Sequence, residues 1–249
     1  MSRHTLIRSK ALGVVIPVHN EEQLLGGALD ALGVAFAEVR DTRLPVHLAL
    51  VFDSCRDASR DVARRWEQSF SRVSALSVSS IATEARNVGV ARRLGSAAVL
   101  EHWDGLSPEN IWIATTDADS RVPRAWLREQ LRRHEAGTDV WAGRVAVQVD
   151  GEVRETMKRW QREYDHEAYP IHGASLGFNG AKYLMGGGFL PLETGEDRAL
   201  LYAMVESGAT AHFESSLRVV TSARRRGHAP HGFAETFHGY DTAFGAIAD

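Results

Sequence analysis

The chain has 249 residues, of which 44% are hydrophobic and 24% are charged, so it can bury a full core as one large α/β domain. Its net charge of -3 and its pI near 6.4 give no general electrostatic reason to expect nucleic acid as a partner. The single cysteine, Cys55, cannot form an internal disulfide, and no apolar stretch is long enough for a transmembrane segment. We therefore expect a cytoplasmic protein.

The first half of the chain alternates short apolar strands with helices. β-branched apolar runs at residues 12–18 and 47–52 predict strands that are covered on both faces, and apolar residues at helical spacing lie between them. Further elements expected in this half are a helix around residues 62–66, a weak strand at 75–78, a helix at 86–100 and a strand at 111–114. Right-handed βαβ crossovers would gather the loops that follow these strands at one edge of a twisted, mostly parallel sheet.

The second half has a different order of elements. The patterns predict a surface helix at residues 126–134, a strand at 140–149 and a long polar helix at 152–169. After Gly173-Ala174-Ser175 we expect a short helix, a helix that begins near Gly195, and a strand at 217–220. A basic, histidine-containing tail at residues 223–249 completes the chain.

Two carboxylates, Asp117 and Asp119, stand directly after the apolar strand at residues 111–114. Carboxylates one residue apart at the carboxyl end of a strand can share a hard divalent cation that keeps positions open for substrate phosphates. The alternative is structural, because Asp119-Ser120 before Pro123 would also suit a turn followed by a helix cap.

Four blocks of the sequence resemble family 2 glycosyltransferases of the GT-A fold, which move a sugar from a nucleotide-sugar donor to an acceptor. The blocks are Val15-Ile16-Pro17-Val18-His19-Asn20-Glu21-Glu22, Val51-Phe52-Asp53-Ser54, Thr116-Asp117-Ala118-Asp119, and Gly187-Gly188-Phe189 with Gly195-Glu196-Asp197. The resemblance covers most of the chain. It implies one GT-A domain over residues 1–249, with a nucleotide-sugar-binding half at about 11–122 and a smaller acceptor-side half at about 137–222.

The resemblance assigns the donor nucleotide to the first three blocks. The residues expected to bind the nucleotide-sugar are Pro17, Val18, His19, Asn20, Glu21, Asp53, Arg86, Asp117 and Ala118. Asp53 would accept a hydrogen bond from uracil, although the family commonly has two acids where this chain has Asp53-Ser54. UDP-sugar is therefore the expected donor and GDP-sugar the alternative. The structural readings are an ordinary helix N-cap at Asn20-Glu21-Glu22 and a surface arginine at a helix start for Arg86.

The resemblance also implies a metal and a base. Asp117 and Asp119 would hold Mg²⁺ or Mn²⁺ against the diphosphate, and the late histidine His228 is a candidate third ligand. Glu196 and Asp197 are the expected catalytic acids beside the acceptor, and Asp197 is the candidate general base of an inverting transfer. Acids at a helix start can also act simply as a capping pair.

Two other functions remain open at the level of sequence. A sugar-phosphate nucleotidyltransferase of related topology would also use a metal-binding acid pair, but it normally opens with a glycine-rich basic loop where this chain has Pro17-Val18-His19-Asn20. A catalytically inactive nucleotide-binding scaffold would be marked by the loss of Asp119 or Asp197, and both acids are present. The sequence therefore predicts a hexosyltransferase with an unknown acceptor.

Overall fold

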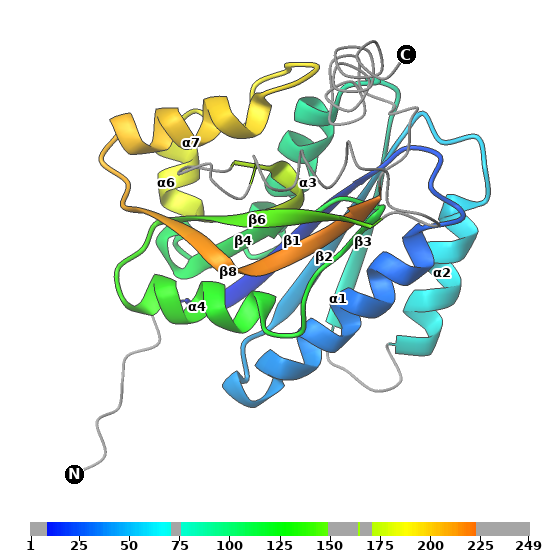
Figure 1. Cartoon of the computed structure of the whole chain (residues 1–249), viewed down its shortest axis with the longest axis horizontal. Coiled ribbons are helices and arrows are strands. Elements are labelled where there is room, and N and C mark those ends of the chain that lie inside the picture. Colours follow the sequence, from blue (N-terminus) through cyan, green and yellow to red (C-terminus); the bar gives the residue numbers. More distant parts are fainter. Residues whose placement is uncertain (1–8, 71–75, 149–163, 165–170, 223–249) are drawn as a thin grey trace, which may run out of the picture.

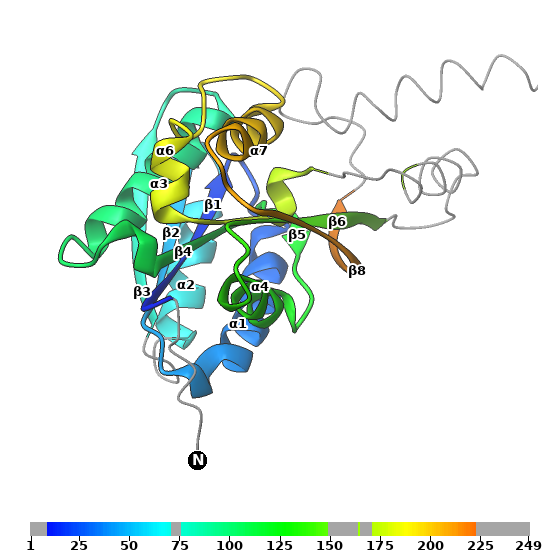
Figure 2. The same cartoon turned by 90° about the vertical axis from the view of Figure 1, so that its left-hand side faces the viewer.

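The structure is a computed structural model that describes residues 9–70, 76–148, 164 and 171–222. Its eight strands form one sheet in the order β3-β2-β1-β4-β7-β6-β8-β5, with helices on both faces (Figures 1 and 2). This arrangement confirms the predicted mixed α/β class with a largely parallel sheet. The predicted helix at 152–169 lies outside the described residues, apart from Tyr164, which is helical and buried.

The first four strands are parallel, as expected for buried βαβ units. β1 (Ala11–Val18) pairs with both β2 (Val46–Asp53) and β4 (Ile111–Thr115), and β2 pairs with β3 (Leu76–Thr83). The connecting helices are α1 (Leu25–Val39), α2 (Ser59–Phe70) and α3 (Val88–His102). Every element predicted in this half is present, and β3 runs five residues beyond the predicted end, where its backbone continues to pair with β2.

The remaining strands reverse direction. β7 (Leu176–Asn179) is antiparallel to β4 and to β6 (Val140–Gln148), while β8 (Ala211–Ser222) is parallel to β6. The two-residue β5 (Ser120–Arg121) pairs with the far edge of β8. Neither β5 nor β7 was predicted, because strands of two and four residues carry too little alternation to detect in the sequence.

Two helical layers enclose the sheet (Figure 1). Helices α1, α2 and α4 (Trp126–Glu135) cover one face, and α3, α6 (Gly180–Met185) and α7 (Glu196–Glu206) cover the other. Short 3-10 turns complete the elements at Arg40–Thr42, Pro108–Asn110 and Gly173–Ser175. Helix α4 is the surface helix predicted at residues 126–134, since Arg128, Arg132 and Glu135 are exposed while its other face buries Trp126 and Leu127 against the sheet. Each helical layer has its own apolar core against the sheet.

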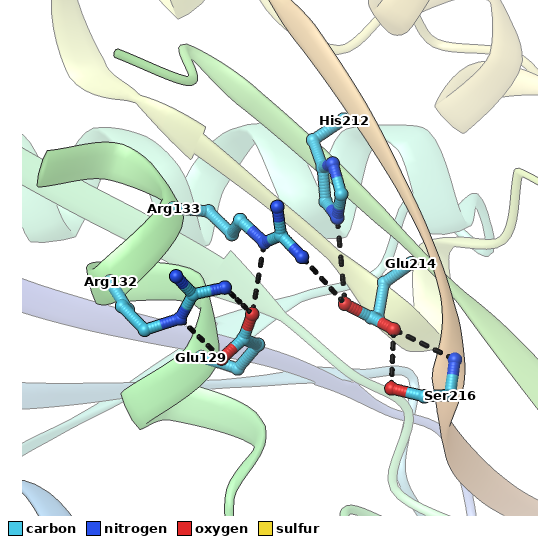
Figure 3. Close-up of polar contacts among 6 residues, drawn as sticks. All are labelled: Glu129, Arg132, Arg133, His212, Glu214 and Ser216. Carbon is cyan, nitrogen blue, oxygen red and sulfur yellow. Dashed lines mark hydrogen bonds and ion pairs between the residues drawn. The ribbon is translucent and has the colours of Figure 1, made fainter. Parts of the chain in front are cut away.

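A polar cluster ties α4 to a bulge in β8 (Figure 3). The register along β6 jumps from Gly143↔Glu214 to Arg144↔Arg218, so β8 carries extra residues there. The buried carboxylate of Glu214 accepts hydrogen bonds from the backbone N–H and the hydroxyl of Ser216, at 2.7 and 2.6 Å. Around it lie His212 on the same strand and, from α4, Glu129 with Arg132 and Arg133. The cluster satisfies the carboxylate that the bulge buries.

Candidate active site

Three of the strand-end loops contain a residue with an unusual backbone conformation. Asn20 after β1, Ser54 after β2 and Arg86 after β3 have φ values of 52°, 53° and 49°, a left-handed region that residues other than glycine seldom adopt. Because parallel strands end at the same edge of a sheet, the three loops meet there. Such conformations persist only when surrounding bonds fix them, and they are frequent at ligand-binding sites.

Asp53 is the residue that fixes these loops. Its Oδ1 accepts the backbone N–H of Arg86 at 2.9 Å, and its Oδ2 accepts the backbone N–H of Asn87 at 2.8 Å. The hydroxyl of Ser54 also donates to Oδ1, at 3.0 Å. Asp53, predicted as a base-binding residue, is thus buried and holds the start of α3. Arg86 is positioned through its backbone, and Asn87 is the side-chain N-cap of α3.

The loop after β1 contacts the loop after β2 rather than capping its own helix. Helix α1 begins at Leu25 without a side-chain cap or an acidic first turn, so the N-cap reading of residues 20–22 was wrong. Instead, Asn20 Oδ1 accepts the N–H of Arg56 at 2.8 Å, and Glu22 Oε2 accepts the N–H of Ala58 at 2.9 Å. The residues expected to line the donor pocket follow one another here. Pro17 and Val18 end β1, and His19 Nδ1 donates a hydrogen bond to the backbone carbonyl of Asp53 at 2.6 Å. Glu21 is buried, and its backbone N–H donates to the hydroxyl of Ser59.

The acid pair follows β4 on the same edge of the sheet. Asp117 and Asp119 are half-buried on either side of the buried Ala118. Asp119 Oδ1 accepts hydrogen bonds from the hydroxyls of Ser120, at 3.2 Å, and Thr221, at 3.3 Å. Helix α4 starts only at Trp126 without a side-chain cap, so the pair does not cap it. Burial raises the pKa of Asp117, and the nearby carboxylate of Asp119 raises it further.

The second pair of acids opens α7. Glu196 and Asp197 occupy its first turn after Gly195, whose φ of 77° suits glycine. Asp197 is half-buried, and its Oδ2 accepts the backbone N–H of Gly173 at 2.7 Å. Glu196 is almost fully buried, and the guanidinium of Arg92 in α3 donates to its Oε1.

The guanidinium of Arg92 also contacts the acid pair after β4. Arg92 Nη2 donates to Asp117 Oδ1 at 2.5 Å, so one buried arginine contacts both Asp117 and Glu196. Helices α3 and α7, which supply Arg92 and Glu196, lie on the same face of the sheet (Figure 1). The two acid pairs, about 80 residues apart in the chain, are therefore parts of one cluster.

Residues 13–187 match the family described as Glycosyl transferase family 2, which is well over half of the chain. The chain belongs to this family. No curated protein matches the family 2 chain by sequence.

Solved structures share the fold at low sequence identity. TarS 1-349 of S. aureus, in complex with UDP-GlcNAc, is 13% identical with a TM-score of 0.64, over 92% of this chain and 64% of that one. The mannosyltransferase PcManGT of Pyrobaculum calidifontis, with GDP-Man and Mn²⁺, is 19% identical with a TM-score of 0.61, over 90% of this chain and 60% of that one. The family 2 chain thus spans less than two thirds of either structure. These similarities establish the GT-A type of fold.

Arg92 was missed in the sequence although a signal for it existed. The buried residues of α3 include Gly89, Ser96 and Val99, which with Arg92 form one stripe at helical spacing. A charged residue on a buried stripe needs a partner, because an isolated buried charge is very unfavourable. That stripe could have pointed to a buried ion pair, but not to which acids form it.

No group of three or more His, Cys, Asp or Glu side chains that could hold a metal ion occurs in the part of the chain that the structure describes. His228, the predicted late ligand, lies outside those residues. None of the helices among them is long and apolar enough to cross a membrane.

Proposed function

We propose that this family 2 protein is a hexosyltransferase that moves a sugar from a nucleotide-diphosphate sugar, with UDP-sugar as the first choice, to an acceptor hydroxyl. The observation that carries the proposal is the single cluster formed by Asp117, Arg92 and Glu196, with Asp197 beside it, because it puts a donor-side acid next to a candidate base. The nucleotide-sugars bound to the TarS and PcManGT structures support a donor of this class.

The donor half would comprise residues 11–122, and the loops after β1, β2 and β3 would bind the nucleotide. These loops carry backbone groups held in unusual conformations and the buried Glu21, whose carboxylate can accept from ribose hydroxyls. Asp53 already accepts two backbone N–H groups, so we assign its main role to shaping this pocket and only its remaining lone pairs to the base. The acceptor half would comprise residues 137–222.

The acids also fit a divalent cation, Mg²⁺ or Mn²⁺. Burial raises the pKa of Asp117, and the nearby carboxylates of Asp119 and Asp197 add to the rise although the charge of Arg92 opposes it, so a bound cation would favour the charged form of Asp117. Such a cation, held by one or two carboxylates and by substrate phosphates, needs no cage of protein ligands. Asp117 and Asp119 would hold it, and its chemistry would be to stabilise negative charge on the departing diphosphate. The Mn²⁺ in the PcManGT structure supports this assignment.

Asp197 is proposed as the general base. Its carboxylate is oriented by the backbone N–H of Gly173 at 2.7 Å and by that of Arg198 at 2.7 Å. As the acceptor oxygen forms a bond to the anomeric carbon, its proton passes to Asp197, and the bond from that carbon to the phosphate oxygen breaks with its electron pair leaving on the diphosphate. Attack from the face opposite the leaving group inverts the anomeric centre.

The donor assignment is tested by titrating the purified protein with UDP and with GDP in a calorimeter, each with Mn²⁺ and with a chelator. Metal-dependent UDP binding supports the proposal, and a preference for GDP redirects it to mannose-type donors. If neither nucleotide binds and no UDP-sugar or GDP-sugar is hydrolysed or transferred, the proposed function is wrong.

The metal assignment is tested by Asp119→Asn. We expect this change to weaken the metal-dependent affinity for UDP at least about 100-fold, because a neutral amide is a much weaker ligand for a hard cation than a carboxylate is. Asp104→Asn, in the turn after α3, is the matched control and should bind UDP normally. Equal Mn²⁺ dependence in both variants would contradict a metal at this acid pair.

A further inference from the structure

Arg92 is a charged residue in the interior of the protein. Its side chain is only 4% exposed, and it lies in α3 among the buried residues Gly95, Ser96 and Val99. Placing a guanidinium there is unfavourable unless acids compensate it. The arrangement therefore has to be explained by what the guanidinium contacts.

Two carboxylates compensate the charge, and they come from distant parts of the chain. Nη2 donates to Asp117, 25 residues away, and Nη1 donates to Glu196, 104 residues away. The planar guanidinium presents its donors in a fixed fork, which lets one side chain set the relative position of two acids. A lysine at this position offers one point charge without that geometry.

The guanidinium also determines where the turn at residues 173–175 can lie. A Cβ added to Gly173 would collide with Cζ and both Nη atoms of Arg92, so only glycine allows this approach. The N–H of the same Gly173 donates to Asp197 Oδ2 at 2.7 Å. Arg92 thus contacts Glu196 directly, and it lies close to the glycine whose N–H orients Asp197.

The two neighbouring acids consequently differ in what they can do. Glu196 is engaged by Arg92 and is 3% exposed, so its carboxylate cannot meet an acceptor hydroxyl. Asp197 accepts hydrogen bonds from backbone N–H groups. Because its side chain is half-buried, its carboxylate stays accessible. Burial raises the pKa of Glu196 while Arg92 opposes the rise, as expected for an acid whose partner is this arginine.

We propose that Arg92 is a positioning residue that joins the donor-side acid Asp117 to Glu196, and that Glu196 acts only through this bridge and leaves Asp197 as the sole base of the pair. The inference rests on the proposed function. It differs from the sequence-based expectation in one respect, because it makes Glu196 an anchor instead of a second catalytic acid. It also links the donor half to the acceptor half through one side chain.

A double-mutant cycle between Arg92→Met and Glu196→Gln tests the bridge. In the unaltered protein, Glu196→Gln should lower kcat about 10-fold, with little change in the donor KM, through loss of orientation. In the Arg92→Met background, the same change should have no further effect. Equal, multiplicative losses in both backgrounds would overturn the proposal, because they would mean that Glu196 acts without Arg92.

Two further variants keep the test decisive if Arg92→Met does not fold. Arg92→Lys keeps the charge but loses the fork, so we expect a folded protein with lowered kcat. Gly173→Ala should lower kcat by displacing Arg92, whereas Gly105→Ala, where an added Cβ meets nothing within 4 Å, should not. Full activity in both Arg92→Lys and Gly173→Ala would also overturn the bridge.

Thermal unfolding separates a failure of this inference from a failure of the proposed function. If the unaltered protein turns over no nucleotide-sugar, the proposed function fails, but the Tm values of the same double-mutant cycle still measure the pairing. Non-additive Tm changes then support the bridge as a fixed link between the acid pairs. Additive Tm changes overturn it.

Discussion

The strand-end loops and the two acid pairs are held by different kinds of bond. At the ends of β1, β2 and β3, Asp53 and Asn20 accept backbone N–H groups, and the loops that they join lie next to one another. In the acid cluster, the buried guanidinium of Arg92 joins Asp117, in the loop after β4, to Glu196 in α7. The proposed donor pocket is therefore shaped by the main chain, and the acid cluster by long-range charge pairing.

The largest effect is expected from a change at Asp197, the proposed general base. Asp197→Asn removes the proposed base but keeps a side chain that can accept the N–H of Gly173. We expect kcat to fall about 100- to 10,000-fold while Mn²⁺-dependent UDP binding is unchanged, as measured by turnover and calorimetry. Glu206→Gln, at the exposed far end of α7, is the control. A variant with normal turnover would show that another group takes the proton.

The next effect concerns the donor side. Asp53→Asn replaces one of two accepting oxygens by a donor, so either the N–H of Arg86 or that of Asn87 loses its partner. An unsatisfied N–H costs about 1–3 kcal/mol when it is fully buried. These two bonds are only partly buried, so we expect the free energy of unfolding to fall by the low end of that range. UDP binding should weaken roughly 10-fold because the loops lose their fixed geometry.

Asp61→Asn on the exposed side of α2 is the matched control for this change. It should alter neither quantity. If Asp53→Asn changed affinity without changing stability, Asp53 would contact the base directly and would not act by holding the loops.

This difference in bonding explains what could be predicted from the sequence. Asp53, Asp117 and Asp119 were identified because an apolar run followed by an acid places that acid at a known edge of a parallel sheet. The roles of Arg92 and Gly173 depend on which helix lies over which loop, and nothing local in either segment records that. The hydrogen bonds from backbone N–H groups to Asp53 were missed for the same reason, since the two donors are 33 and 34 residues away in the chain.

A smaller effect is expected from an acid whose surroundings resemble those of Glu196. Glu214 also lies buried beside an arginine, but it belongs to the β8 bulge and faces α4 (Figure 3). Although burial opposes it, hydrogen bonds from Ser216 keep the pKa of Glu214 below its ordinary value. Glu214→Gln should lower the free energy of unfolding by about 1 kcal/mol, read by chemical denaturation, and leave kcat unchanged. Loss of turnover in this folded variant would contradict the distinction between a structural acid and the Arg92 bridge.

The last effect is the most conditional, because it appears only when the pH falls, and it comes from the opposite end of the sheet, away from both the strand-end loops and the acid cluster. His47 in β2 is stacked on His102 with ring centroids 3.9 Å apart, and its ring nitrogens contact the hydroxyls of Ser77, at 2.8 Å, and Ser79, at 3.0 Å. Trp103 packs edge-on against the same ring. Burial, with a contribution from His102, lowers the pKa of His47 from 6.5 to about 4.

Because the folded state resists protonation of His47, the unfolded chain takes up the proton first as the pH falls. The stability that neutral His47 contributes is present above pH 6.5 and is lost between about 6.5 and 4. By this linkage, lowering the pH from 7 to 4.5 should cost about 2 kcal/mol more in the unaltered protein than in His47→Gln, which cannot titrate. Denaturation curves at the two pH values measure the difference, and parallel pH dependence in both proteins would show that folding does not lower the pKa of His47. His102→Gln should keep most of the effect, since burial of His47 is its main cause.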